Sequence, residues 1–242
     1  MLKRLFVFAV ATVCFVLAGL IGWLVGVEFY GGHASRQSHS APVLGQAPQY
    51  SGLTDQTGHT VDSSQFKGKV QVVTFLFPYC TTYCPLIAAH LVGFEHLLKD
   101  SGLQSKVAVV AFNVDPAGTG PKQMRAFLKE YGWDPSDRHF EYLTGKPKQI
   151  RHVVRDGFHI DYEKVTDSAS AQDRGPQQTP QPEVVNPLAQ KANVNYDISH
   201  NDGMVIVGPH GHIRKIFDQA DVVSNHELLK AVKPLLPAGG SG

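Results

Sequence analysis

The stretch VQVVTFLFPYCTTYCP, residues 70–85, decides the fold. Its first half, residues 70–77, is a run of β-branched and aromatic residues that is typical of a strand buried on both faces. Two cysteines follow, Cys80 and Cys84. After them, apolar residues recur through 85–100 at the spacing of an amphipathic helix. The sequence therefore predicts a strand, a cysteine-bearing loop and a helix in that order.

The predicted loop places Cys84 at the N-terminus of the helix. Pro85 suits the first helical position, where its missing N–H costs nothing. The positive end of the helix dipole is expected to stabilise a thiolate at Cys84. Two thiols at this spacing can close a disulfide or bind one soft cation between two sulfurs. Both uses need thiolate character, so the local sequence leaves the two alternatives open.

The segments around this unit predict an α/β fold, a mixed sheet covered by helices. A hairpin tip is expected at 57–61, and a closing hairpin at 204–207 and 213–217. Further strands are expected at 106–114 and 139–143, and further helices at 121–131, 147–155 and 224–236, the last capped by Ser224.

The N-terminal residues predict a membrane anchor. Lys3 and Arg4 precede an uncharged apolar run from residue 5 to 27, long enough to span the roughly 30 Å core of a bilayer. We expect 1–27 to be an uncleaved transmembrane helix with a cytoplasmic N-terminus, and the rest of the chain to be periplasmic or otherwise extracytoplasmic. A removed signal peptide is the alternative, but its apolar region is usually shorter.

The remaining chain is expected to hold a flexible stalk, one domain and a tail. The stalk is 28–47, rich in Gly, Ser, His, Gln and Pro, and the domain is 48–237. A Pro- and Gln-rich stretch at about 165–192 is expected to be an exposed insertion. The last residues, 238–242, are expected to be a disordered tail.

Composition excludes several classes of protein. The 22 Lys+Arg and 21 Asp+Glu leave a net charge of +1, which argues against nucleic-acid binding. A hydrophobic content of 43% argues against a wholly disordered chain. Three cysteines are too few for a small disulfide scaffold.

These motifs resemble those of the Sco/SenC family, whose members are membrane-anchored, thioredoxin-fold proteins. They bind copper and help to assemble the binuclear copper centre of cytochrome c oxidase. The likeness covers nearly the whole predicted domain and rests on motifs in the family's order: Phe-Lys-Gly-Lys at 66–69, Cys-Thr-Thr-Tyr-Cys-Pro at 80–85, Asn-Val-Asp-Pro at 113–116, Tyr-Leu-Thr-Gly at 142–145, Ser-His at 199–200, and the strand and turn at 204–209.

The resemblance implies a ligand set of Cys80, Cys84 and His200. Thiolates select Cu(I), and imidazole suits both Cu(I) and Cu(II). The position before the histidine is Ser199, where many members have aspartate, so Asp197 or a backbone carbonyl is the candidate acceptor for the imidazole. Asp115 is a candidate supporting residue near the cysteines, or else a turn residue.

The leading functional hypothesis is a copper metallochaperone rather than an enzyme. Its expected partners are the copper-bearing subunit of cytochrome c oxidase and other copper chaperones or thiol–disulfide reductants. The alternative is a thiol–disulfide oxidoreductase that keeps the oxidase's ligand cysteines reduced, with Cys80 as the more exposed attacking thiolate and Cys84 as the resolving thiol. Residues 198–203 contain no proline, where thioredoxins carry a cis-proline, and this favours the metal site. A thiol peroxidase is a weaker third reading, because Thr82 precedes Cys84 by two positions and not by three.

Overall fold

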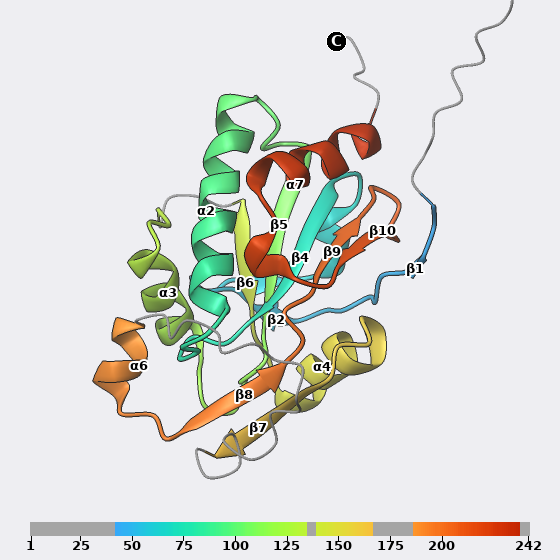
Figure 1. Ribbon diagram of the computed structural model, residues 1–242. Helices are drawn as coiled ribbons and strands as arrows, with labels where there is room; N and C mark the ends of the chain where they lie inside the picture. The colour runs from blue at the N-terminus through green and yellow to red at the C-terminus, as the bar shows by residue number, and fades with distance from the viewer. Residues whose placement is uncertain (1–41, 135–138, 167–185, 238–242) are drawn as a thin grey trace, which may run out of the picture. The chain divides into compact units, whose positions relative to one another are not determined.

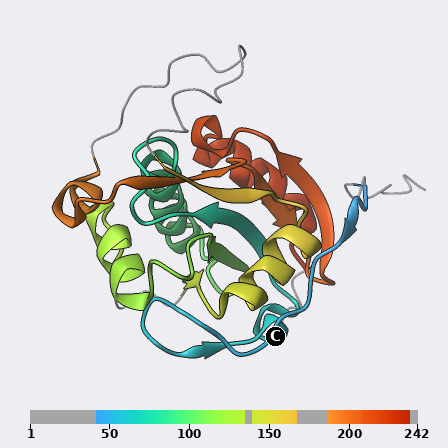
Figure 2. The same cartoon turned by 90° about the horizontal axis from the view of Figure 1, so that it is seen from below.

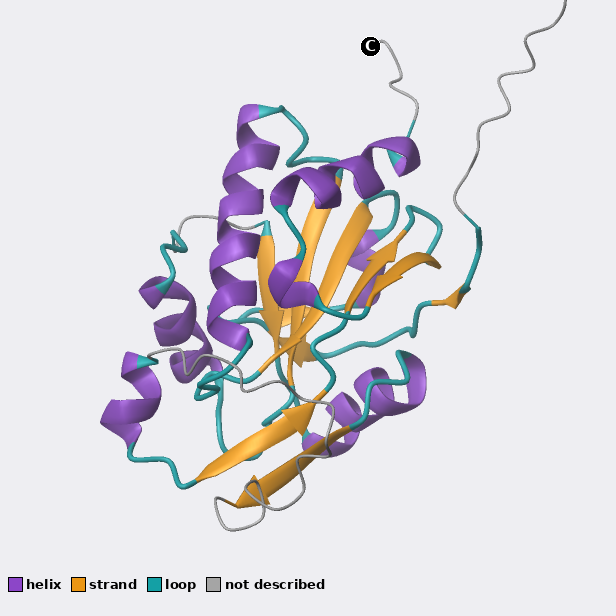
Figure 3. Cartoon of the chain, in the orientation of Figure 1, coloured by secondary structure: helices purple, strands orange, loops and turns teal. Residues whose placement is uncertain are grey.

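A mixed six-stranded sheet forms the centre of the computed structural model, which describes residues 42–134, 139–166 and 186–237 (Figures 1 and 3). The strand order is β1-β10-β9-β4-β5-β6. β4 is parallel to β5 and β5 to β6, whereas β9 is antiparallel to both β4 and β10. The strands are β1 (Gly45–Gln46), β4 (Val70–Leu76), β5 (Val107–Asn113), β6 (Phe140–Leu143), β9 (Met204–Val207) and β10 (His212–Phe217).

The two central strands carry the cysteine loop at one edge of the sheet. Every residue of β5 is buried, and so is every residue of β4 except Gln71. Their parallel register runs from Val70 opposite Val107 to Leu76 opposite Asn113. Such doubly covered strands are stable where both faces are apolar. The strands expected at 70–77 and 106–114 are confirmed, and their carboxyl ends lie together at the edge where the cysteines follow.

Helices cover both faces of this sheet. Figure 2 shows α2 (Cys84–Asp100) and α7 (Asn225–Val232) on one side, and α4 (Pro147–Arg151) on the other. α4 continues as a π-helical turn, His152–Gly157, after which Phe158 packs against Phe75 and Phe112. α3 (Pro121–Glu130) follows β5. The mixed α/β architecture predicted from the sequence is confirmed.

The last helix is shorter than expected from the sequence. α7 ends at Val232, and a 3₁₀ turn, Lys233–Leu235, replaces the rest of the predicted 224–236 helix. Pro234 explains the change, because it has no N–H to continue the α-helical hydrogen bonds. The predicted cap is confirmed: Ser224 Oγ accepts from the backbone N–H of Glu227 at 3.3 Å.

A second, two-stranded sheet lies beside the cysteine edge and was not predicted. β7 (Tyr162–Thr166) and β8 (Tyr196–His200) are antiparallel, with Tyr162 opposite His200. The expected insertion is described in part: its first two residues belong to β7, and α6 (Pro187–Ala192) closes it. A small hairpin, β2 (Leu53–Thr54) with β3 (Thr60–Val61), carries the predicted tip at 57–61.

The expected anchor at 1–27, the stalk up to residue 41 and the tail at 238–242 lie outside the described residues. The described end of the stalk is not a free linker, since β1 pairs with β10 and Leu44 N donates to Ile213 O at 2.8 Å. Backbone pairing explains the difference, because it needs no apolar side chain. Within the described ranges, no helix combines the length and the apolar character needed to span a bilayer.

Candidate metal centre

The loop between β4 and α2 doubles back so that both cysteines face the buried edge of the sheet. Cys84 is the first residue of α2. Its Sγ accepts from Phe77 N at 3.4 Å, and Cys80 N donates to Phe77 O at 3.1 Å. Both cysteines are reduced, and they are 2% and 0% exposed. Cys80, expected to be the more exposed thiol, is therefore nearly as buried as Cys84.

His200, the last residue of β8, reaches the same place. Its Nε2 lies 3.5 Å from Cys84 Sγ, across 116 residues of sequence. Its Nδ1 lies 2.8 Å from the carbonyl oxygen of Asn201. Because a carbonyl only accepts hydrogen bonds, Nδ1 carries a proton and Nε2 is the ring nitrogen turned toward the sulfur. The candidate acceptor for the imidazole is thus a backbone carbonyl, while Asp197 Oδ1 accepts from Ile198 N at 2.8 Å.

The two thiols have different ionisation properties. A hydrogen bond from Cys84 holds the pKa of Cys80 well below its usual value; burial opposes this, and a hydrogen bond from His200 adds to it. Burial raises the pKa of Cys84, and the hydrogen bond and charge of Cys80 raise it further. The expectation that the helix terminus would favour a thiolate at Cys84 is therefore wrong, because burial and the neighbouring Cys80 raise the pKa of Cys84, whereas that of Cys80 is lowered.

The pKa of His200 is linked to that of Cys80. Burial lowers its pKa, but the hydrogen bond and negative charge of Cys80 raise it above its usual value, and Asn201 O adds to the increase. Raised pKa values at Cys84 and His200 favour the protonated forms of these two donors. A cation that binds there competes with protons for the same atoms.

The donor set suits a soft cation. Thiolate and imidazole are ligands of Cu(I), and imidazole also binds Cu(II). Metal–sulfur and metal–nitrogen bonds of about 2.3 and 2.1 Å put the two atoms of a tetrahedral site about 3.6 Å apart, and Cys84 Sγ and His200 Nε2 are 3.5 Å apart. Cys80 Sγ lies 3.3 Å from Thr82 Oγ1. Within the described ranges, no group of three or more His, Cys, Asp or Glu side chains is already arranged as a metal cluster.

Asp115 acts on the strand that carries His200 and not on the donors themselves. It is 4% exposed, and its carboxylate accepts from Tyr196 Oη at 2.7 Å and from Gly118 N at 3.2 Å. Among the described residues it makes no hydrogen bond to the cysteines or to His200. Tyr196 begins β8, so Asp115 fixes the strand at the end opposite the imidazole.

Two residues near the cysteine loop, Tyr196 and Asn186, were not predicted from the sequence. Tyr196 packs against Phe77, with ring centroids 5.7 Å apart, and Lys164 Nζ lies 3.4 Å from its ring centroid. Asn186 is buried and bonds to the cysteine loop. The dipeptide Asn186-Pro187 is a helix-start signal that could have identified α6. Tyr79 and Tyr83, which flank Cys80 and Cys84, are partly buried and pack against the hydrophobic core.

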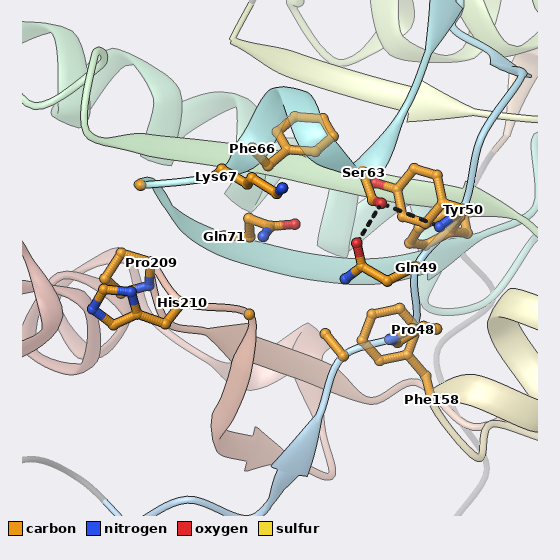
Figure 4. Close-up of a pocket in the computed structure, with 14 residues that line it drawn as sticks. Pro48, Gln49, Tyr50, Ser63, Phe66, Lys67, Gln71, Phe158, Pro209 and His210 are labelled. Atoms are coloured by element: carbon orange, nitrogen blue, oxygen red, sulfur yellow. Dashed lines mark hydrogen bonds between the residues drawn. The ribbon is translucent and has the colours of Figure 1, made fainter.

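A cavity of about 360 Å³ lies apart from the sulfur donors (Figure 4). Its lining comes from residues 47–50, from Phe66 to Gly68, and from the turn between β9 and β10, with Gln71 and Phe158. Neither cysteine nor His200 is among its lining residues. The candidate metal centre is therefore the buried cluster at the cysteine edge and not this cavity.

Comparison with known sequences points to one family. The family model described as SCO1/SenC matches residues 46–177, more than half of the chain. The SCO1 protein homolog of Bacillus subtilis is 23% identical over 180 residues, which cover 74% of this chain and 77% of that protein.

Solved structures with the same fold include Bradyrhizobium japonicum ScoI with copper bound. It is 21% identical, with a TM-score of 0.57, and the match covers 79% of this chain and 99% of that one. BsSco, a member of the Sco family of cytochrome c oxidase assembly proteins with a disulfide switch, is 22% identical, with a TM-score of 0.56 over 80% of this chain and 95% of that one. At these identities the two structures support a shared thioredoxin-like fold.

Proposed function

The chain belongs to the SCO1/SenC family, and on that premise we propose that it binds one copper ion through Cys80, Cys84 and His200. The protein delivers this ion to the copper-bearing subunit of cytochrome c oxidase during assembly. Copper is the cargo of this reaction. The three side chains hold it without filling every coordination position, so that a thiol of the recipient can enter and take the ion.

One observation carries the proposal: Nε2 of His200 lies 3.5 Å from Cys84 Sγ, while Nδ1 is bound to a backbone carbonyl. A histidine that only filled space would not need a fixed tautomer aimed at a buried dithiol. The depressed pKa of Cys80, caused by Cys84 and His200, adds a ready thiolate. The likeness to a copper-bound ScoI and to an oxidase-assembly Sco protein supports the choice of cargo and client.

The location proposed for this activity is the outer face of a membrane. Residues 1–27 would anchor the chain with its N-terminus in the cytoplasm, and the domain would face the extracytoplasmic side. Other copper chaperones, or thiol–disulfide reductants, would reload or reduce the site there. The sulfur donors must be reduced before copper binds, so such a reductant belongs to the cycle.

Copper titration of the reduced full-length protein tests the proposal. We expect one copper per chain for the wild type. Cys80→Ser, Cys84→Ser and His200→Ala should each lower the affinity at least tenfold, since loss of a residue that merely supports a ligand costs about 10–100-fold. His96→Ala is the matched control, because His96 lies exposed on the same helix as Cys84. Wild-type affinity in His200→Ala would contradict the ligand set.

The asymmetry of the two thiols favours a second candidate function. Cys80 has the depressed pKa and Cys84 the raised one, as in a thiol–disulfide oxidoreductase whose first thiol attacks and whose second resolves the mixed disulfide. In that role the protein would keep the oxidase's ligand cysteines reduced. Disulfide reduction that continues in His200→Ala, together with unchanged copper binding in that variant, would favour this function over delivery.

A further inference from the structure

Asn186 lies at the end of the predicted insertion, yet it is bonded to the loop that carries Cys80. Its side chain is 1% exposed. Its amide nitrogen donates to the carbonyl oxygen of Pro78 at 3.0 Å and to that of Cys80 at 2.7 Å, across 108 and 106 residues of sequence. Both amide N–H groups are therefore used on one short segment of backbone.

The other end of the same side chain is fixed to a helix. Asn186 Oδ1 accepts from Leu188 N at 3.0 Å and from Ala189 N at 3.3 Å, which caps α6. α6 packs against α3 (Figure 1), and Leu188 contacts the hydrophobic core. The amide thus joins the cysteine loop to α6, a helix that is held in place by its packing against α3 and the hydrophobic core.

These bonds restrain the backbone on which Cys80 sits. β4 ends at Leu76 and α2 begins at Cys84, so the ladder and helix hydrogen bonds stop on either side of the loop. Cys80 N donates to Phe77 O, and Cys80 O accepts from Asn186. Without the amide, the buried carbonyls of Pro78 and Cys80 would lose a partner, and the loop would rearrange until they reached another donor.

We infer that Asn186 is a positioning residue for the metal centre. By holding the carbonyls of Pro78 and Cys80, it keeps the Cys80 sulfur beside Cys84 and His200, which limits access to that thiol and strengthens the binding of copper. The part about copper rests on the proposed function. The part about access to the thiol does not.

Three substitutions separate this role from helix capping. Asn186→Asp has the same shape and keeps the capping oxygen, but it replaces the donating NH₂ with an oxygen that faces two carbonyls. Asn186→Ser also keeps a capping oxygen, adds no charge, and is too short to reach the loop. Asn186→Ala removes both functions. Gln190→Ala, an exposed position on the same helix, is the matched control.

Two measurements on the reduced full-length protein test the inference. The first is the rate of alkylation of Cys80 by iodoacetamide as a function of pH, with peptide mass spectrometry to identify the site. The plateau of that profile, where the thiol is fully ionised, no longer depends on the fraction of thiolate and reports access together with the nucleophilicity of the thiolate. The second is copper affinity, together with the sulfur-to-Cu(II) charge-transfer spectrum. We expect a severalfold higher plateau rate, and copper binding about tenfold weaker with an altered spectrum, in Asn186→Asp, Asn186→Ser and Asn186→Ala.

Results that differ from this expectation have the following meanings. If Asn186→Asp and Asn186→Ser match the wild type while Asn186→Ala is impaired, Asn186 is only a helix cap and the inference is overturned. If Asn186→Ala does not fold, the two variants that keep the cap still decide. If the wild type itself binds no copper, the proposed function fails, and the alkylation rates alone then show whether Asn186 positions Cys80.

Discussion

The hydroxyl of Tyr196 donates a 2.7 Å hydrogen bond to the carboxylate of Asp115, 81 residues earlier in the chain. This bond ties the start of β8 to the loop between β5 and α3. β8 ends with His200, and the ring of Tyr196 packs against Phe77 at the start of the cysteine loop. Tyr196 therefore links the strand that carries the imidazole to both loops at the carboxyl edge of the sheet.

Tyr196→Phe should lower the free energy of unfolding by about 1.5–3 kcal/mol, the usual range for a hydrogen bond to a charged group. The ring contacts remain, so the loss belongs to the hydroxyl. Copper affinity should fall by less than in His200→Ala, because β8 stays paired with β7. Urea unfolding and copper titration measure the two effects. Tyr131→Phe is the control: no partner of the buried Tyr131 hydroxyl is found in the described part of the chain, so its loss should not destabilise the protein.

Gly118→Ala should disturb the same bond from the other side. A Cβ at this position would collide with Asp115 Oδ2 and with the hydroxyl of Tyr196. Overpacking of this kind costs about 1–3 kcal/mol. Because Phe at 196 removes one of the two clashing atoms, the double variant should be less destabilised than the sum of the single variants. Strict additivity in a double-mutant cycle would mean that Gly118 and Tyr196 do not share this contact.

Gly45→Ala is a matched control for that cycle. Its Cβ would meet its nearest neighbour, Ile213 Cδ1, at an ordinary 3.8 Å. It should leave stability nearly unchanged, within about 0.5 kcal/mol.

Asp55 should stabilise the protein in a pH-dependent way. Burial raises the pKa of this carboxyl, but hydrogen bonds from Thr57 and His59 lower it more, at 2.7 Å from Thr57 N and 2.8 Å from His59 N. A folded-state pKa below the unfolded value of about 3.9 gives stability that is present above that value and lost as pH falls through the folded pKa. Asp55→Asn should therefore cost about 1.5–3 kcal/mol at neutral pH.

Urea unfolding between neutral and acidic pH tests the direction of this pH dependence. The difference in unfolding free energy between wild type and Asp55→Asn should shrink as the medium is acidified. A difference that stays constant down to the lowest accessible pH would show that the charge of Asp55 plays no part.

The strand, loop and helix around Cys80 and Cys84 could be predicted because their signals are local. The seven residues of β4 and of β5 are apolar enough to need burial on two faces, and α2 repeats its apolar residues at helical spacing. The ligand set followed from a family resemblance. It did not follow from local pattern, since His200 lies 116 residues from Cys84.

The strand and the side chains that hold the site in place could not be predicted, because they depend on tertiary contacts of polar residues. Asp197 and Ser199 give β8 the polarity of a loop, and pairing with β7 makes it a strand. Asn186 lies next to a stretch rich in Pro and Gln, where a buried amide is not expected from composition. The helix dipole at Cys84 can be predicted from the sequence, whereas the burial and the neighbouring charge that raise the pKa of this thiol cannot.

Copper affinity should increase with pH, because copper competes with two protons. Burial lowers the pKa of His200, but its hydrogen bond with Cys80 and the charge of that thiolate raise it above the usual value; burial, with the neighbouring thiolate, raises that of Cys84. The pKa of Cys80 is lowered mainly by the hydrogen bond from Cys84, so Cys80 has already lost its proton. Where Cys80 is ionised while Cys84 and His200 still carry their protons, binding should release about two protons, which gives a slope of about two in log affinity per pH unit. Above the pKa of His200 the slope should fall to about one.

Competition titrations against a chelator of known proton dependence measure these slopes. Cys84→Ser removes one of the displaced protons, so its slope should be smaller by about one over the same range. His96→Ala should keep the wild-type slope, since His96 is exposed on α2. An affinity independent of pH from mildly acidic to neutral would mean that neither Cys84 nor His200 gives up a proton to copper. The buried dithiol would then be a redox pair whose histidine only stabilises the thiolate of Cys80.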